Sequence, residues 1–353
     1  MQIKELKGRY INNAHLLPVL KRHFQQEYEI IGFSEEKRPI YALKLGEGNT
    51  KILMWSQMHG DESTTTKAVL DFAKSFKSNI RQAADVQIVI IPILNPDGAY
   101  HYTRVNANGV DLNRDAYKAT QLEMQVLHRV YREVKPDFCF NLHDQRNMYT
   151  VGDSNESASL SFLSPSADSE KTWTNSRVQS ACLINNMVKA LPEHVKPNVG
   201  RYNDDFNINC TGDYFQSLHT PTILFEAGHC RDDYIREKTR NYVFLSLQQA
   251  LKTINDGICK ENDVDLILET YQAIPENTKK FYDEVLIFDE KTIGVRFNLK
   301  KEGEYLEFIP EFSLLNNDDY VTNRLFDASK IKEESVKQHL NFRRNQLEYY
   351  VFN

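Results

Sequence analysis

The sequence predicts an α/β protein with a mixed, mostly parallel central sheet covered by helices, and a smaller β-rich region at the C-terminal end. Two observations predict this fold class. Apolar segments of strand length alternate with amphipathic segments of helix length over most of the chain. Near residue 260 this alternation gives way to strand-like segments separated by glycine turns. Because 353 residues is long for a single core, we expect a division into 1–259 and 260–353.

The individual elements follow from their periodicity. Near-continuous apolar strands are typical of parallel sheets buried on both faces, and ligands collect at the C-terminal ends of such strands. In chain order we expect a helix over 15–24, three strands within 28–60, a helix over 61–76, a strand within 85–102 that ends in an Asn-Pro-Asp-Gly turn, a helix over 118–137, a strand over 138–143, a helix over 169–191, a strand over 220–229, a helix over 236–257, strands within 284–312 and a charged tail.

Charge and hydropathy exclude several classes of partner. The net charge is -6 and the sequence pI is about 6.0, and no basic block is present that could neutralise phosphates, so we expect no nucleic-acid partner. We also expect no membrane partner, because no segment approaches the length of a membrane span. The first residues lack an apolar core followed by a cleavage site, which favours a cytoplasmic location.

The cysteines give no sign of a metal ribbon or a redox pair. Their number is odd, their positions are scattered, and no two have Cys-x-x-Cys spacing. We therefore expect reduced thiols at Cys139, Cys182, Cys210, Cys230 and Cys259.

Chemically active residues stand at the ends of several expected strands. His59 and Glu62 follow one strand, and this pair alone fits either a metal site or a charged helix start. His143 and Glu226 end two other strands. Two imidazoles and a carboxylate are the ligand set of a hydrolytic zinc site, in which a fourth position holds water. Such a site needs a further carboxylate as general base, and Glu226 fits because poor solvation at an apolar strand raises its basicity.

The segment TRVNANGVDLNRD, residues 103–115, has the composition of a site for an acid. It contains Arg104, Asp111, Asn113 and Arg114. Two guanidinium groups and an amide are enough to hold a carboxylate and to stabilise an oxyanion.

Together these motifs resemble the zinc metallocarboxypeptidases, the carboxypeptidase A-like peptidases of family M14. The matching segments are HGDE, NPDG, RVNANGVDLNR, NLH and FEAGH, in the family's order, within roughly residues 1–258. The resemblance implies the family's α/β fold and one zinc ion per chain. It implies that His59, Glu62 and His143 are the zinc ligands and that Asp111 is the carboxylate behind the first histidine.

The resemblance also implies roles for the other residues. Glu226 matches the general base that takes a proton from water and passes it to the leaving amine. Arg104 matches the arginine that polarises the scissile carbonyl. Asn113 and Arg114 match the pair that holds the substrate's terminal carboxylate. Tyr202 is the first candidate for the family's mobile tyrosine, with Tyr214 as the alternative.

One departure from the family concerns substrate preference. Asp61 stands inside the zinc motif, where the digestive enzymes carry an arginine.

Three functional hypotheses remain open from the sequence. The first is hydrolysis that releases the C-terminal amino acid of a peptide-like substrate by zinc-activated water. The second is an amide hydrolase for other substrates, either an N-acyl amino acid deacylase similar to aspartoacylase and succinylglutamate desuccinylase or a cell-wall peptide amidase. The third is a silent protein that binds C-terminal carboxylates. In each case the partner is a peptide or acyl-amino acid with a free carboxylate.

Overall fold

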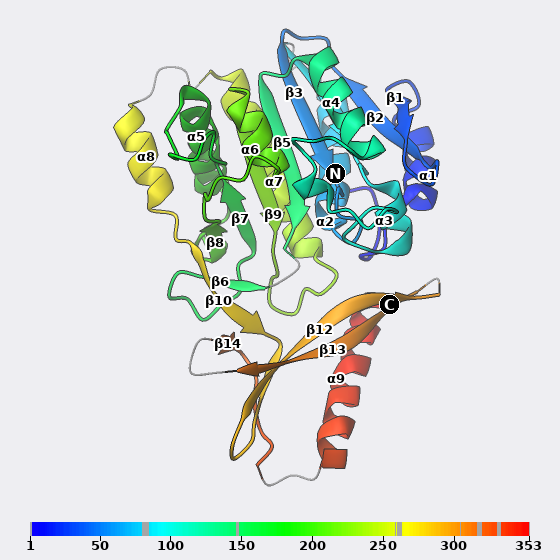
Figure 1. Cartoon of the computed structure of the whole chain (residues 1–353), viewed down its shortest axis with the longest axis vertical. Coiled ribbons are helices and arrows are strands. Elements are labelled where there is room, and N and C mark those ends of the chain that lie inside the picture. Colours follow the sequence, from blue (N-terminus) through cyan, green and yellow to red (C-terminus); the bar gives the residue numbers. More distant parts are fainter. Residues whose placement is uncertain are drawn as a thin grey trace.

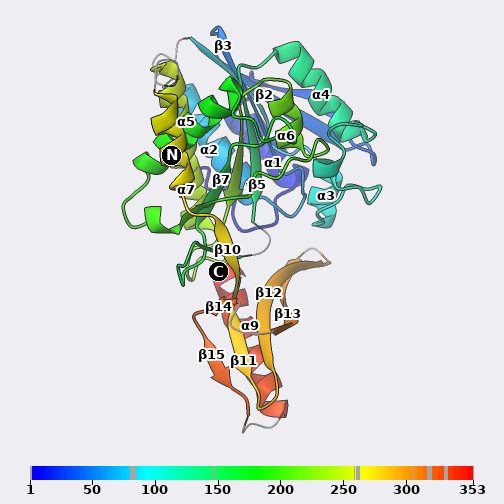
Figure 2. The ribbon, with the colours of Figure 1, turned by 60° about the vertical axis from the view of Figure 1, so that its left-hand side comes forward.

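The fold is given by a computed structural model of the chain, which describes residues 2–79, 85–145, 148–257, 259, 263–303, 305–315, 320–329 and 333–352. Figure 1 shows a large part built around a sheet, with a smaller part of long strands and one helix below it. Figure 2 shows the same arrangement after a turn about the vertical axis.

The main sheet is mixed, with parallel strands at its centre. Among the described residues it contains eight strands in the order β1-β2-β4-β3-β5-β9-β7-β8. The pairs from β4 through β3 and β5 to β9 are parallel, whereas β1, β2 and β7 join them in antiparallel pairs. Its strands are β1 (Tyr28–Phe33), β2 (Pro39–Leu45), β3 (Thr50–Ser56), β4 (Val86–Ile91), β5 (Phe138–Asp144), β7 (Leu160–Leu163), β8 (Val199–Arg201) and β9 (Thr222–Ala227).

Helices cover both faces of this sheet, each through its apolar side chains. One face packs on α1, α2, α5 and α7, and α8 packs on α5 at the outside. The other face packs on α4 and α6, where Leu127 and Phe215 meet Trp55 of β3. The helices of this part are α1 (Asn13–His23), α2 (Thr64–Ser78), α3 (Pro96–His101), α4 (Leu122–Val134), α5 (Asn175–Ala190), α6 (Thr211–Ser217), α7 (Glu237–Asn255) and α8 (Val264–Gln272), with short 3-10 turns η2 (Leu112–Arg114) and η3 (Lys196–Asn198).

The expected fold class is confirmed, with differences in detail. The Asn-Pro-Asp-Gly segment begins helix α3 rather than only a turn. Asn95 caps this helix by accepting a hydrogen bond from the amide of Gly98, and Pro96 stands in the first helical turn, where proline is well tolerated. The short strands β7 and β8 were not expected, because three or four residues give too little periodicity to recognise.

The C-terminal part is a four-stranded sheet packed against a helix. Its order is β13-β12-β11-β15. The expected charged tail is a helix, α9, whose Val336, Leu340 and Leu347 pack on Phe297 and Phe308 of the sheet. The elements are β10 (Asn277–Tyr282), β11 (Glu284–Ile287), β12 (Thr292–Glu302), β13 (Tyr305–Leu315), β14 (Tyr320–Thr322), β15 (Leu325–Asp327) and α9 (Glu333–Phe352).

A small sheet joins the two parts. Strand β6 (Tyr149–Val151), which follows β5 of the main sheet, pairs with β10, and β10 pairs in turn with β14. Tyr234, between β9 and α7, donates a hydrogen bond to Asp283 and packs edge-on against Phe308 of β13. The expected boundary between 259 and 260 stays a prediction, since residue 260 lies outside the described residues.

Within the described part of the chain, no helix combines the length and the apolar character that crossing a membrane requires.

A disulfide joins Cys182 of α5 to Cys259, which follows α7. The expectation of reduced thiols is therefore wrong for these two cysteines. Their 77-residue separation carries no local signal, and only the packing of α5 against α7 brings the two segments together. Cys139, Cys210 and Cys230 are free thiols, as expected.

We expect Cys182→Ser to lower the free energy of unfolding by about 2–4 kcal/mol, because opening a long loop restores entropy to the unfolded chain. Denaturant unfolding without a reducing agent measures this change. Cys210→Ser, at a free thiol, is the control and should unfold close to the wild type. Non-reducing peptide mapping that finds both Cys182 and Cys259 as free thiols would contradict the disulfide.

Candidate metal centre

Parallel strands bring the candidate ligands to one edge of the main sheet. Strand β3 ends at Ser56, shortly before His59, and its neighbour β5 ends with His143 and Asp144. The next strand, β9, places Glu226 directly opposite His143 in the pairing register. All three strands run in the same direction, so their C-terminal ends meet.

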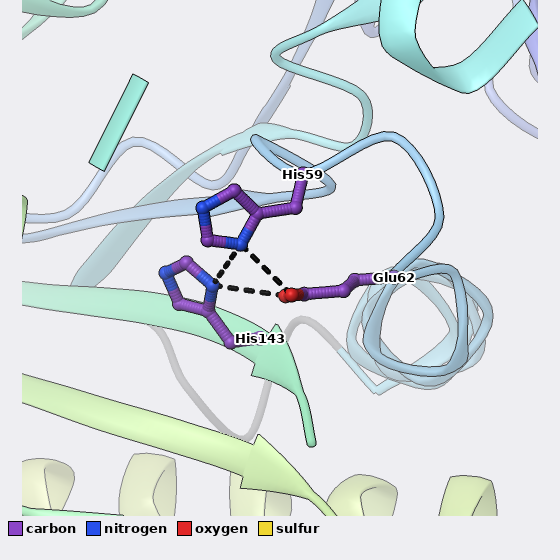
Figure 3. Close-up of side chains that lie close together, drawn as sticks. All are labelled: His59, Glu62 and His143. Atoms are coloured by element: carbon purple, nitrogen blue, oxygen red, sulfur yellow. Dashed lines mark hydrogen bonds and ion pairs between the residues drawn. The ribbon is translucent and has the colours of Figure 1, made fainter. Parts of the chain in front are cut away.

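His59, Glu62 and His143 converge on one point (Figure 3). Nδ1 of His59 lies 2.8 Å from Oε1 of Glu62, and Nδ1 of His143 lies 3.0 Å from Oε2. The two Nδ1 atoms are 3.2 Å apart. All three residues are at most 4% exposed, so their charge is compensated by one another and by neighbouring groups rather than by water.

Asp111 determines which nitrogen of His59 faces the centre. Its Oδ1 lies 3.0 Å from Nε2 of His59. A carboxylate only accepts hydrogen bonds, so Nε2 carries a proton, and Nδ1 is the nitrogen that faces the centre. A carboxylate behind a metal-binding histidine is a common arrangement that orients the ring and raises its basicity.

The charges of this cluster shift the pKa values of its members. Burial lowers the pKa of His59, but the negative charge of Glu62 and the hydrogen bond to Asp111 outweigh it and raise that pKa to about 9. Burial raises the pKa of Glu62, yet His59 and His143 hold it well below its usual value. Glu62 is therefore ionised, as a metal ligand must be.

Close backbone packing fixes the loop that carries His59 and Glu62. A Cβ atom on Gly60 would lie 1.8 Å from the carbonyl carbon of Gly98, so the loops of HGDE and NPDG touch through glycine. The amide of Gly60 also donates a hydrogen bond to the carbonyl of Thr103. The two motifs thus form one structural unit, which the sequence does not reveal.

Asp144 links the end of β5 to the start of α2. Its carboxylate accepts hydrogen bonds from the amides of Thr64 and Thr65, at the positive end of the helix. Its own amide donates to Oε2 of Glu62 at 3.1 Å. This contact holds Glu62 and the neighbouring His143 in register, and no local pattern in the sequence pointed to it.

Glu226 is half-buried and stands beside the converging ligands. Burial raises its pKa well above the usual value, and the negative charge of Glu62 raises it further. A divalent cation between the two carboxylates would counter this repulsion. The expected position of Glu226 near the three ligands is thus met, while its role as base stays a prediction.

Arg104 lies against the same carboxylates. Its Nη1 donates to Glu62 at 3.2 Å, and its Nε donates to Asp111 at 3.1 Å. The side chain is 31% exposed, so the guanidinium group can also reach a substrate. Its proposed role at a scissile carbonyl fits this place beside the centre.

Asn113 and Arg114 lie on η2, just after Asp111. Oδ1 of Asn113 accepts a hydrogen bond from the amide of Thr211 at the start of α6, which leaves its NH₂ group as the donor for a ligand. The exposed Arg114 donates to the carbonyl of Asn113 and lies 3.2 Å from the sulfur of Cys210. The pair occupies the side of the site that α6 borders.

The two tyrosine candidates lie in different surroundings. Tyr202 follows β8 and meets Tyr149 edge-on, with 6.4 Å between ring centroids, and burial and then the negative charge of Glu226 raise its pKa. Tyr214 instead stacks on His128 of α4, with 4.8 Å between ring centroids. Tyr214 therefore belongs to the apolar packing, and Tyr202 remains the candidate.

A cavity of about 570 Å³ opens beside the centre. Glu62 and Arg104 line one side of it, and residues of β12 and β13 line another. Arg9 and Arg236 also line it, and the sequence gave no reason to single them out. They come from the N-terminal segment and from the residue before α7, so only the fold brings them to this place.

Comparison with known proteins agrees with this geometry. Residues 20–173 match the family model described as zinc carboxypeptidase. The chain is 25% identical over 125 residues to probable carboxypeptidase 2 of Trichophyton verrucosum, and 25% identical over 132 residues to carboxypeptidase 2 of Trichophyton rubrum. These matches cover 31% and 33% of this chain, but only 24% of either relative.

Solved structures match a larger share of the chain. The metallo-carboxypeptidase from Burkholderia cenocepacia has a TM-score of 0.56 at 17% identity, with 70% of each chain covered. A metallo-carboxypeptidase from Pseudomonas aeruginosa, solved in complex with (2-guanidinoethylmercapto)succinic acid, has a TM-score of 0.56 at 15% identity, again with 70% of each chain covered. At such identities these structures show the fold alone.

The chain resembles the zinc carboxypeptidases in sequence and in fold. The family model includes His59, Glu62 and His143 in the residues that it matches. It ends before Tyr202 and Glu226, whose roles stay predictions from the resemblance.

The residues at the centre fit the zinc ion of these carboxypeptidases. Their donor set is two imidazole nitrogens and one ionised carboxylate, the set that would hold a hydrolytic zinc ion. The proton of His59 is directed away from the centre by Asp111, as ligation through Nδ1 requires. The structure therefore supports the expected zinc site, while the number of ions per chain stays a prediction.

We expect His143→Ala to lower bound zinc far more than Tyr202→Phe, because only the first removes a ligand. Metal analysis after dialysis of each protein measures the difference. His194→Ala, at an exposed histidine that packs on Tyr242, is the matched control and should keep its zinc. Equal zinc content in His143→Ala and the control would remove His143 from the ligand set.

Proposed function

We propose that the protein is a zinc-dependent hydrolase that releases the C-terminal amino acid from a peptide-like substrate. One observation carries this proposal. The cluster of His59, Glu62 and His143 has Glu226 on one side and Arg104 on another, with the pair Asn113 and Arg114 following the same loop. These are the groups that amide hydrolysis beside a terminal carboxylate requires.

The residues of the chain divide the work of this reaction. Arg114 and the NH₂ group of Asn113 bind the substrate's terminal carboxylate and so set its position. Arg104 donates to the carbonyl oxygen as negative charge develops on it. A bound zinc ion supplies Lewis acidity and lowers the pKa of water to about 7. Glu226 takes the proton of the attacking water and passes it to the leaving amine.

Tyr202 belongs to the same arrangement. Burial and the negative charge of Glu226 raise its pKa, so the phenol stays protonated at neutral pH and can donate a hydrogen bond to bound substrate.

A second candidate function is the removal of a small acyl group from an acyl-amino acid. The observation in its favour is the cavity of about 570 Å³, which residues of β12 and β13 border on the side away from the main sheet. A bordered cavity of this size favours a small acyl part over a long peptide. Comparing release of amino acids from N-acyl amino acids and from longer peptides distinguishes the two functions.

The cellular location is a separate question. We expected a cytoplasmic protein from its sequence, but the disulfide between Cys182 and Cys259 favours an oxidising compartment, since cytosolic thiols are kept reduced. Fractionation of cells with an antibody against the protein decides between the two.

We expect Glu226→Gln to abolish turnover while zinc content is kept, because the amide cannot accept and return the proton. Release of free amino acids from a dipeptide library, with metal analysis of the same samples, measures both quantities. Glu193→Gln, at a carboxylate exposed on the surface, is the matched control and should keep its activity. If the wild type also binds zinc but releases no amino acid, the protein is a silent carboxylate binder.

We expect Arg114→Ala to raise KM for substrates with a free terminal carboxylate by about 10- to 100-fold, the range for a lost hydrogen bond to a charged group. Steady-state kinetics on each free peptide and its amidated form measure this change. The amidated form lacks the carboxylate and serves as the internal control. If Arg114→Ala raises KM by the same factor for the free and the amidated peptide, Arg114 does not bind the carboxylate.

A further inference from the structure

The cavity beside the metal centre does not include the residues proposed to bind the terminal carboxylate. Glu62 and Arg104 lie on its wall, but neither Asn113 nor Arg114 is among the described residues that line it. If the terminal carboxylate lies at Arg114 and the cleaved bond lies at Arg104, the cavity receives what is left of the substrate. That part is the acyl group, on the carbonyl side of the cleaved bond.

The C-terminal part forms the opposite wall of this cavity. Strand β12 contributes Arg296 through Lys300, and β13 contributes Phe308, Ile309 and Glu311. Tyr234 and Asp283 line it too, at the point where the two parts are joined by a hydrogen bond. An acyl group that enters is therefore bordered by both parts of the molecule.

The carboxylates of the cavity are already engaged. Asp144 accepts hydrogen bonds from the amides at the start of α2. Asp283 accepts hydrogen bonds from the hydroxyl of Tyr234 and from the amide of Phe297. Glu311 pairs with Arg296 at 3.8 Å, and Asp61 also has a partner. Glu62 belongs to the metal centre. Each acid of the cavity therefore already has a hydrogen-bond or ion-pair partner.

Two arginines of the cavity, Arg9 and Arg236, each keep a buried Nε without a hydrogen-bond partner among the described residues. Arg236 is only 4% exposed, and it donates to the carbonyls of Ala227 and Gln145, which are neutral. It forms an ion pair with Asp144 at 3.7 Å, which is longer than a hydrogen bond, and its buried Nε has no hydrogen-bond partner among the described residues. Such a group is costly to bury unless a ligand completes its contacts.

Arg9 strengthens the same positive region. Its Nε is buried without a hydrogen-bond partner, and its guanidinium has no ion pair within the described chain. The positive charges of both arginines also affect the pKa of His229, another residue of the cavity wall. Burial first, then the charges of Arg236 and Arg9, lower the pKa of His229 to about 3, so this ring is neutral and adds no further charge.

We propose that this cavity binds the acyl part of the substrate and that Arg9 and Arg236 bind a carboxylate carried by it. The inference rests on the proposed function, which it narrows to substrates whose acyl part is short and acidic. A guanidinium group binds a carboxylate through two parallel hydrogen bonds, and Arg236 has an unused donor for such a contact. Arg104, at the edge of the same cavity, stays available for the carbonyl oxygen.

The test compares the binding of two acyl groups of equal length. N-succinylglycine and N-butyrylglycine differ only in a terminal carboxylate in place of a methyl group, and glycine avoids any preference for a side chain. Titration calorimetry uses the full-length Glu226→Gln variant loaded with zinc, in which neither compound is consumed. We expect N-succinylglycine to bind about 10- to 100-fold more tightly, as for a hydrogen bond between charged groups.

Variants of Arg9 then test whether the preference for N-succinylglycine depends on the positive charge of the cavity. Arg9→Gln in the same background should remove most of the preference and leave the affinity for N-butyrylglycine nearly unchanged. Arg132→Gln, at an exposed arginine of α4 outside the cavity, is the matched control and should keep the preference. If Arg9→Gln does not fold, Arg9→Lys keeps the charge and should retain part of the preference.

Three results would overturn the inference. These are equal affinity for the two compounds, a succinyl preference that survives Arg9→Gln, and no binding of either compound. The proposed function is judged separately by the wild type on dipeptides. Turnover of neutral dipeptides without any succinyl preference would keep the function and reject the acidic acyl site.

Discussion

The buried carboxylate of Glu62 is the constraint on which the rest of the site depends. An ionised carboxylate inside a protein costs several kcal/mol unless its surroundings compensate it. Here the compensation comes from His59 on its own loop, from His143 and the amide of Asp144 on β5, and from Arg104 on a third segment. One negative charge therefore holds together three regions that are far apart in the sequence.

The same charge organises its surroundings into regions of opposite sign. On one side, burial and then this charge raise the pKa of Glu226, and a cation there would relieve the repulsion between the two carboxylates. On the other side lies a wall with two arginines whose charge the neighbouring acids do not fully match. Under the proposed function, a substrate that bridges these regions would meet the cation at its reacting carbonyl and positive charge at both of its ends, at Arg114 and at Arg236.

Much of the site follows from sequence motifs, because each motif is short and stands where a strand ends. The three ligands and Asp111 lie together as the motifs predict, since parallel strands place their ends at one edge. What the motifs do not contain is contact between distant segments. Arg9, Arg236 and the link from Asp144 to α2 depend on how loops and helices pack, and the pairing of Cys182 with Cys259 depends on α5 meeting α7. Helix α9 was not expected, although Val336, Leu340 and Leu347 stand at helical spacing, because charged residues surround them in the sequence.

The pairing of β6 with β10 makes the C-terminal part a structural neighbour of the metal-binding strand. Strand β6 comes only a few residues after Asp144, so the chain that leaves the ligand His143 soon enters a sheet completed by residues beyond position 276. A version of the protein shortened to its larger part would leave β6 with an open edge next to the reaction centre, available to any other chain.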